Sequence, residues 1–165
     1  MHPLFHAFSR QVSRPAVFRW FLFRSLPAAF FAGLRLRKLD EQTAAVSVSY
    51  SWLTRNPFRS MYFAVQAMAA EMSTGLLASG YVYRSEPGIS ILVTGVQAEF
   101  IKRVTGEVIF TCRDGEKIAA LIADAVSSGE ARTLTCLSVG KDRDGAEVSR
   151  FNITWSFRAR KNKQL

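Results

Sequence analysis

One acidic residue stands out as a group that could do chemistry. Between Arg59 and Arg84, the only charged residue is Glu71. A carboxylate among apolar neighbours has a raised pKa unless it is paired, and a general base that works near neutral pH needs such a pKa. The alternative is a structural role, in which Glu71 binds backbone N–H groups or an arginine of a second copy. Glu71 is therefore the first candidate for a catalytic or ligand-contacting residue.

Other kinds of catalytic site find little support in the sequence. His2 and His6 are the two histidines, and both lie in a basic N-terminal stretch, so a Ser/His/Asp triad is not expected. Cys112 and Cys136 fit no metal-binding spacing, and no glycine-rich phosphate loop occurs. We predict no metal site and no cofactor. We expect the cysteines to be free thiols in a reducing compartment, with a disulfide between neighbouring strands as the alternative.

The first 39 residues are rich in Arg and Phe and contain no Asp or Glu. We expect helices here that dock on the rest of the domain, with breaks at Pro15, Pro27 and Gly33. An organelle transit peptide and a basic helix on a membrane surface are the alternatives. The net charge of +9 favours anionic partners in general. Nucleic acid is not expected, because the aromatic residues fall on buried alternating faces, which leaves no stacking platform.

Residues 61–79 predict one long helix that holds Glu71 near its middle. Apolar residues recur at helical spacing, Ser60 is a suitable N-cap, and Gly80 is a suitable C-cap. Because Glu71 is its one charge, this helix is expected to be buried on nearly all sides. A membrane span is the competing interpretation, and a carboxylate at its centre disfavours it.

The remaining segments predict mainly strands. Alternation over 34–39 and 46–52 indicates an antiparallel pair or one long bent strand, and the apolar run 89–101 indicates a central strand covered on both faces. Further strands are expected over 104–113, 130–140 and 147–158, with a short helix over 118–126 and a hairpin turn over 142–145. The sequence shows no internal repeat and no domain boundary. The prediction is a single α+β domain over 1–165, with a basic helical extension (1–31) and a core (33–158) whose sheet wraps one helix.

Three segments together resemble the uncharacterised thioesterase-like members of the hotdog superfamily. They are LPAAFFAGLRLRKLDEQTAAVSVSYSW, NPFRSMYFAVQAMAAEMSTGLLA and VTGVQAEFIKRVTGEVIFTC, within residues 26–114. The resemblance implies an antiparallel sheet wrapped around a long central helix, and a homodimer or a dimer of dimers formed by pairing sheets edge to edge. It implies hydrolysis of acyl-coenzyme A or acyl-carrier thioesters. We expect the protein in the cytoplasm, in keeping with free thiols in a reducing compartment.

The resemblance also assigns candidate site residues. Glu71 matches the helix acid that acts as base or nucleophile, and Asn56 matches a loop asparagine. Tyr62, Phe63 and Ala64 stand where relatives have His-Gly-Gly, and the Phe63 amide would polarise the thioester carbonyl. We therefore predict Glu71 and Phe63 as catalytic residues, with substrate bound by Asn56, Arg59, Tyr62 and Gln66.

The bulky side chains at the helix start leave a second function open. Tyr62 and Phe63 would narrow the approach that glycines leave free in relatives. The alternative is a non-catalytic acyl- or lipid-binding module, in which the basic N-terminal helices act as a lid or as a peripheral membrane contact.

Overall fold

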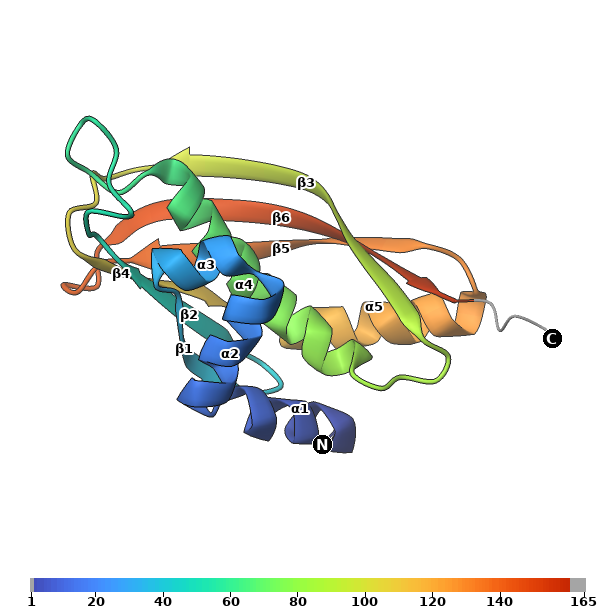
Figure 1. The fold of residues 1–165 in the computed structure, drawn as a ribbon. Helices are drawn as coiled ribbons and strands as arrows, with labels where there is room; N and C mark the ends of the chain where they lie inside the picture. Colours follow the sequence, from blue (N-terminus) through green and yellow to red (C-terminus); the bar gives the residue numbers. More distant parts are fainter. Residues whose placement is uncertain (1, 161–165) are drawn as a thin grey trace.

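The computed structural model describes residues 2–160, which form one antiparallel sheet and five helices (Figure 1). The sheet order is β1-β2-β4-β5-β6-β3. The strands are β1 (Arg35–Leu39), β2 (Ala44–Ser49), β3 (Ile89–Phe100), β4 (Glu107–Cys112), β5 (Arg132–Lys141) and β6 (Glu147–Ala159). The helices are α1 (Pro3–Val12), α2 (Pro15–Ser25), α3 (Pro27–Ala32), α4 (Phe63–Val82) and α5 (Gly115–Ser128).

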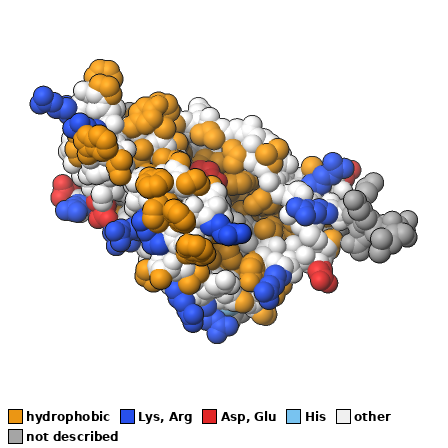
Figure 2. Space-filling view, in the orientation of Figure 1, with side chains coloured by type: hydrophobic (Ala, Val, Ile, Leu, Met, Phe, Trp, Pro, Cys, Tyr) orange, Lys and Arg blue, Asp and Glu red, His pale blue; other side chains and the backbone are white. Residues whose placement is uncertain are grey.

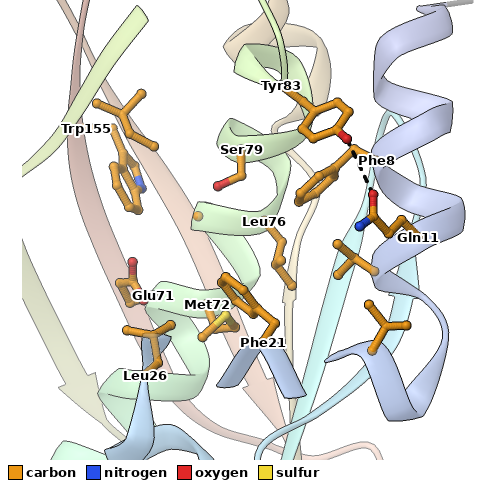
Figure 3. Close-up of a pocket in the computed structure, with 14 residues that line it drawn as sticks. Phe8, Gln11, Phe21, Leu26, Glu71, Met72, Leu76, Ser79, Tyr83 and Trp155 are labelled. Atoms are coloured by element: carbon orange, nitrogen blue, oxygen red, sulfur yellow. Dashed lines mark hydrogen bonds between the residues drawn. The ribbon is translucent and has the colours of Figure 1, made fainter. Parts of the chain in front are cut away.

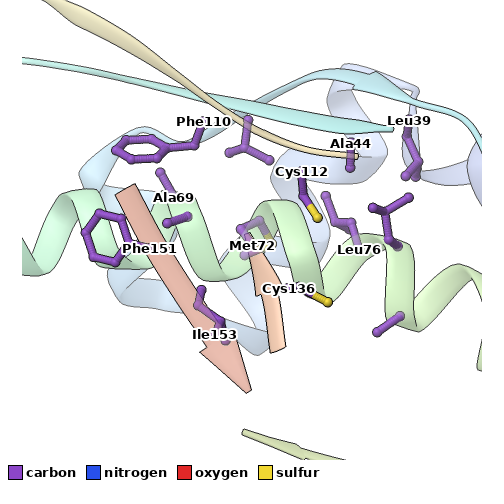
Figure 4. Close-up of a cluster of buried hydrophobic side chains, with 14 of the residues drawn as sticks. Leu39, Ala44, Ala69, Met72, Leu76, Phe110, Cys112, Cys136, Phe151 and Ile153 are labelled. Carbon is purple, nitrogen blue, oxygen red and sulfur yellow. The ribbon is translucent and has the colours of Figure 1, made fainter. Parts of the chain in front are cut away.

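Helix α4 lies across the inner face of the sheet and contacts five of its six strands, β2 to β6. Figure 4 shows how Ala69, Met72 and Leu76 of α4 meet side chains of the sheet, among them Phe110 and Phe151. These side chains are 5% exposed or less, and twelve α4 residues are buried in all. The predicted α+β fold, with a sheet wrapped around one long helix and extra N-terminal helices, is confirmed.

The N-terminal helices pack on the outer side of α4 and beside β1. Each begins with a proline, and Gly33 ends α3 with φ 78°, a left-handed conformation that glycine adopts without strain. Phe5, Phe18 and Leu22 are almost fully buried and anchor the first two helices. The expected docking of this stretch is therefore observed. No helix within residues 2–160 is both long and apolar enough to cross a membrane.

The ends of several elements differ from the sequence prediction. Helix α4 starts at Phe63 without a side-chain cap, because Ser60 bonds to Asn56 instead. It ends after Gly80, which lies inside the helix against the Phe5 ring. The second strand stops at Ser49, and Trp52 is 73% exposed in the following loop. At the end of the described residues, the Arg160 side chain donates a hydrogen bond to Ser90.

The strand predicted to be central is an edge strand, and this is the largest correction. β3 pairs with β6 on one side and with no strand among residues 2–160 on the other. Its outward residues are exposed, with Leu92 at 65% and Val96 at 56%. A continuous apolar run predicts a strand that other parts of a protein cover. In a single copy of this chain, no strand of residues 2–160 pairs with the outer edge of β3.

Candidate functional site

An apolar cavity of about 450 Å³ lies between α4, the N-terminal helices and the β3–β6 part of the sheet. Figure 3 shows Glu71, Met72 and Leu76 of α4 facing Phe21 and Leu26, with Phe8 and Gln11 of α1 closing the far side. Tyr83 donates a hydrogen bond to Gln11 across this end, at 3.4 Å. The volume is typical of a small-molecule site.

Glu71 is the one acidic residue that lines this cavity. Its carboxylate lies between Leu26 and Trp155 (Figure 3), and no side chain or backbone N–H of residues 2–160 bonds to it. Burial raises the pKa of the Glu71 carboxyl above its ordinary value of 4.5, with no charged partner to lower it. The group is therefore poised to accept a proton, as a base must.

A hydrogen-bonded chain holds the helix and the sheet together beside Glu71. The Trp155 indole Nε1–H donates to Thr74 Oγ1 at 2.9 Å, and Thr74 donates to the backbone carbonyl of Glu71, also at 2.9 Å. Gly75 leaves room for the carboxylate, since a Cβ there would lie 3.1 Å from Glu71 Oε1. The contacts fix the backbone at Glu71 and leave its side chain free to meet a ligand.

The other predicted site residues lie at the start of α4, around a second hollow of about 330 Å³. Phe63, Asn56 and Gln66 line it, and Phe63 stacks edge-on with Tyr62 and Phe100. Phe63 is the first residue of α4, and its backbone N–H has no partner within residues 2–160. A free amide at a helix start can polarise a carbonyl oxygen.

Two of the predicted substrate-binding residues have structural partners. Asn56 Oδ1 accepts from the backbone N–H groups of Phe58 and Ser60, at 2.9 and 3.1 Å, and so shapes the loop. Gln66 is 5% exposed and accepts a hydrogen bond from Ser149. Arg59 and Tyr62 are exposed near the helix start. Within one chain, Asn56, Phe63 and Gln66 therefore line one hollow and Glu71 lines another.

Sequence reasoning missed several residues that line the cavity around Glu71. Trp155, Phe21 and Leu26 form much of its wall, together with Ile91 of the edge strand. The aromatic alternation of 151–157 and the Phe-rich N-terminus signalled burial, but they did not show that both surround one acid. Both cysteines are free and buried, away from this cavity.

The sheet, the central helix and the position of the site define a hotdog-fold protein. A Pseudomonas aeruginosa protein described as a probable thioesterase has the same fold, with TM-score 0.74 and 19% identity over 91% of this chain and 99% of that one. A Chlorobaculum tepidum protein of unknown function is similar at TM-score 0.73 and 15% identity, over 92% and 99% of the two chains. A Haemophilus influenzae thioesterase matches at TM-score 0.61 and 12% identity, over 100% and 96%.

The chain belongs to the DUF4442 family, described as a domain of unknown function, whose model matches residues 14–157. That match includes α2 to α5, strands β1 to β5, and β6 as far as Phe157. No curated protein sequence matches the chain. The predicted resemblance to the hotdog superfamily is confirmed at the level of fold and family.

Proposed function

We propose that this chain binds an acyl thioester at a dimer interface and hydrolyses it, with Glu71 as the general base. The observation that carries the proposal is the unpaired Glu71 carboxyl in an apolar cavity. An apolar cavity suits an acyl chain. Glu71 is the group in its wall that can take a proton, and we place the thioester end of the acyl chain beside it. Structural neighbours named as thioesterases agree with this reaction class.

The site is proposed to need two copies of the chain. Phe63 and Glu71 lie eight residues apart in α4, so their positions differ by about 12 Å along the helix axis. One thioester carbonyl cannot meet the amide and the acid of the same helix. If the α4 helices of two copies run antiparallel at a dimer seam, Phe63 of one copy can lie beside Glu71 of the other. We propose that the two copies pair through the exposed edges of β3, which gives the α4 helices this arrangement.

The reaction follows from these two groups. The Glu71 carboxylate accepts a proton from a water molecule, and the water oxygen attacks the thioester carbonyl carbon. The Phe63 amide N–H donates to the carbonyl oxygen as it gains negative charge. The C–S bond then breaks, which leaves a carboxylic acid and a thiolate that takes up a proton. No further reactant is needed.

The exposed residues at the helix start are proposed to contact the carrier part of the substrate. Arg59 would contact coenzyme A phosphates as a charged donor, and Tyr62 would lie along the entry path. Asn56 and Gln66 would act through the shape of the loop and helix start, since their polar groups bond within the chain. We place this activity in the cytoplasm, because both cysteines are free.

A second candidate function is a non-catalytic acyl-binding module on the same fold. The observation that favours it is the bulk at the helix start, where Tyr62 and Phe63 remain 45% and 55% exposed and their rings stack together. These rings stand beside the Phe63 amide and would restrict approach of a carbonyl. The cavity would then hold an acyl chain without turnover.

A panel of acyl-coenzyme A substrates of increasing chain length, tested on wild type and Glu71→Gln, separates these functions. The enzyme predicts turnover that falls by about 10²- to 10⁴-fold in the variant, with acyl-ligand affinity retained. The binding module predicts no turnover in either protein and saturable binding in both. If the wild type shows no turnover and no binding, both functions are contradicted.

A further inference from the structure

A contiguous aromatic surface covers the outside of α2 and α3. Ring contacts join Trp20 to Phe23, Phe23 to Phe30, and Phe30 to Phe31, with centroids 5.8, 5.2 and 5.4 Å apart. Trp20 and Phe31 are each 61% exposed and Phe23 is 49% exposed. Figure 2 shows hydrophobic side chains gathered over these helices. We call Trp20, Phe23 and Phe31 the aromatic patch.

The geometry of α2 makes this exposure conspicuous. At about 100° per residue, Phe18 and Leu22 share the face that packs inward, and Trp20 and Phe23 fall on roughly the opposite side. The inward pair is at most 2% exposed. A helix that only covers a domain has a polar outer face, whereas α2 has apolar side chains on its inner face and on its outer face. Its outer face therefore fits an apolar partner.

The charge around the aromatic patch is of one sign. Helices α1 to α3 contain no acidic residue, and Arg10, Arg14 and Arg24 are exposed. None of these three arginines forms an ion pair within residues 2–160. Figure 2 shows basic side chains beside the hydrophobic ones. Exposed Trp and Phe flanked by Arg are the combination that inserts at the headgroup level of an anionic bilayer.

We propose that the aromatic patch is a docking surface for an anionic phospholipid bilayer. The aromatic rings would enter the headgroup layer, and Arg10, Arg14 and Arg24 would face lipid phosphates. Docking would bring the bilayer next to the cavity, because α2 also supplies Phe21 to the cavity wall and Leu26 follows at its end. The inference rests on the patch and its charge, so it stands or fails independently of thioester hydrolysis.

The test is co-sedimentation of the full chain with vesicles of phosphatidylglycerol and phosphatidylcholine, compared with vesicles of phosphatidylcholine alone. We expect binding to the anionic vesicles that weakens with added salt. The triple variant Trp20→Ser/Phe23→Ser/Phe31→Ser should lose at least tenfold in affinity. Its matched control, Ile109→Ser/Val126→Ser/Leu137→Ser, removes three other exposed apolar side chains and should bind like wild type.

A charge series tests the arginines separately. Arg10→Gln/Arg14→Gln/Arg24→Gln should weaken binding by about fivefold for each arginine. Arg113→Gln/Lys141→Gln/Arg158→Gln removes the same charge from exposed positions on the sheet side and should have much less effect. Equal losses in the two triple variants would mean that only net charge attracts the chain, and this would overturn the proposal.

Two further results would also overturn it. The first is wild type that does not bind anionic vesicles. The second is an oligomer that dissociates in the aromatic triple variant while vesicle binding persists, since a second copy would then cover the patch. Acyl-coenzyme A hydrolysis measured on the same proteins keeps the two proposals apart, because loss of docking leaves turnover of a water-soluble substrate intact.

Discussion

Glu71 combines two features at the scale of a single residue: it is largely buried and its carboxyl has no partner within residues 2–160. Ionising such a group in the folded state costs free energy, and the cost sets both its chemistry and a dependence of stability on pH. Below the ordinary pKa of 4.5, the carboxyl is protonated in folded and unfolded states alike, and no such cost arises.

The free energy of unfolding is expected to fall as pH rises from about 4.5 through the raised pKa of Glu71, because the folded state holds the proton to higher pH. Glu71→Gln removes this dependence. Urea unfolding at a series of pH values should therefore show the variant gaining on wild type as pH rises. A constant difference between the two proteins from pH 4 to pH 8 would contradict the burial of an unpaired carboxyl.

Thr74 is expected to stabilise the wall beside Glu71 through its hydroxyl. In Thr74→Val, the buried Trp155 N–H loses its acceptor, and leaving a buried donor unpaired costs about 1–3 kcal/mol. Thr74→Ser keeps the hydroxyl and serves as the control. Chemical denaturation measures both, and equal stabilities for the Val and Ser variants would show that the hydrogen bond contributes nothing.

Residues of the site differ in how visible they are in the sequence. Glu71 could be predicted, because it is the only charge in a long apolar segment. Trp155 and Phe21 could not be assigned to the same cavity, because they meet it from β6 and α2, and only the strand order and the docking of α2 bring them there. Residue type shows that a side chain is buried, but not what it is buried against.

At the scale of elements, α1 docks through a close contact that the sequence did not indicate. Phe5 is fully buried, and its ring lies over Gly80 and near Tyr81, with centroids of the two rings 4.9 Å apart. A Cβ at Gly80 would lie 2.4 Å from the Phe5 ring. The contact with α1 therefore explains why Gly80 lies inside α4. The sequence predicted Gly80 as a helix C-cap, because a glycine that ends a helix and a glycine that allows close packing look alike in the sequence.

Phe5→Ala is expected to destabilise the chain by about 3–5 kcal/mol if α1 unfolds together with the core. Leu4→Ala, in the same helix but at an exposed position, is the matched control and should change stability little. Thermal unfolding with limited proteolysis of the N-terminus measures both effects. Early cleavage in α1 with an unchanged unfolding transition would show instead that α1 opens on its own.

The elements themselves were more predictable than their partners. Local sequence patterns located α5 and the six strands within residues 2–160, β3 from a continuous apolar run, because burial leaves such patterns in the sequence. The edge position of β3 was missed, because a run of apolar residues looks alike whether a strand is covered by its own sheet or by a second copy.

At the scale of the whole molecule, the exposed edge of β3 is expected to be the dimer seam. Leu92→Lys/Val96→Lys places two charges on that strand, and charges on an edge oppose strand pairing. Sedimentation velocity should show a dimer for wild type and a monomer for this variant. Ile109→Lys/Leu137→Lys changes exposed residues of interior strands and should leave the dimer intact. A variant of β3 that remains dimeric would place the seam elsewhere.

The pH dependence of kcat/KM for acyl-coenzyme A hydrolysis tests the central role of Glu71 most directly. A general base must be ionised to act, so the rate should rise with pH through an inflection above 4.5, which reports the raised pKa of Glu71. Glu71→Gln should lose this inflection and about 10²- to 10⁴-fold in rate. If Glu71→Gln showed the same inflection as wild type and the same rate at pH values above the inflection, Glu71 would not be the general base.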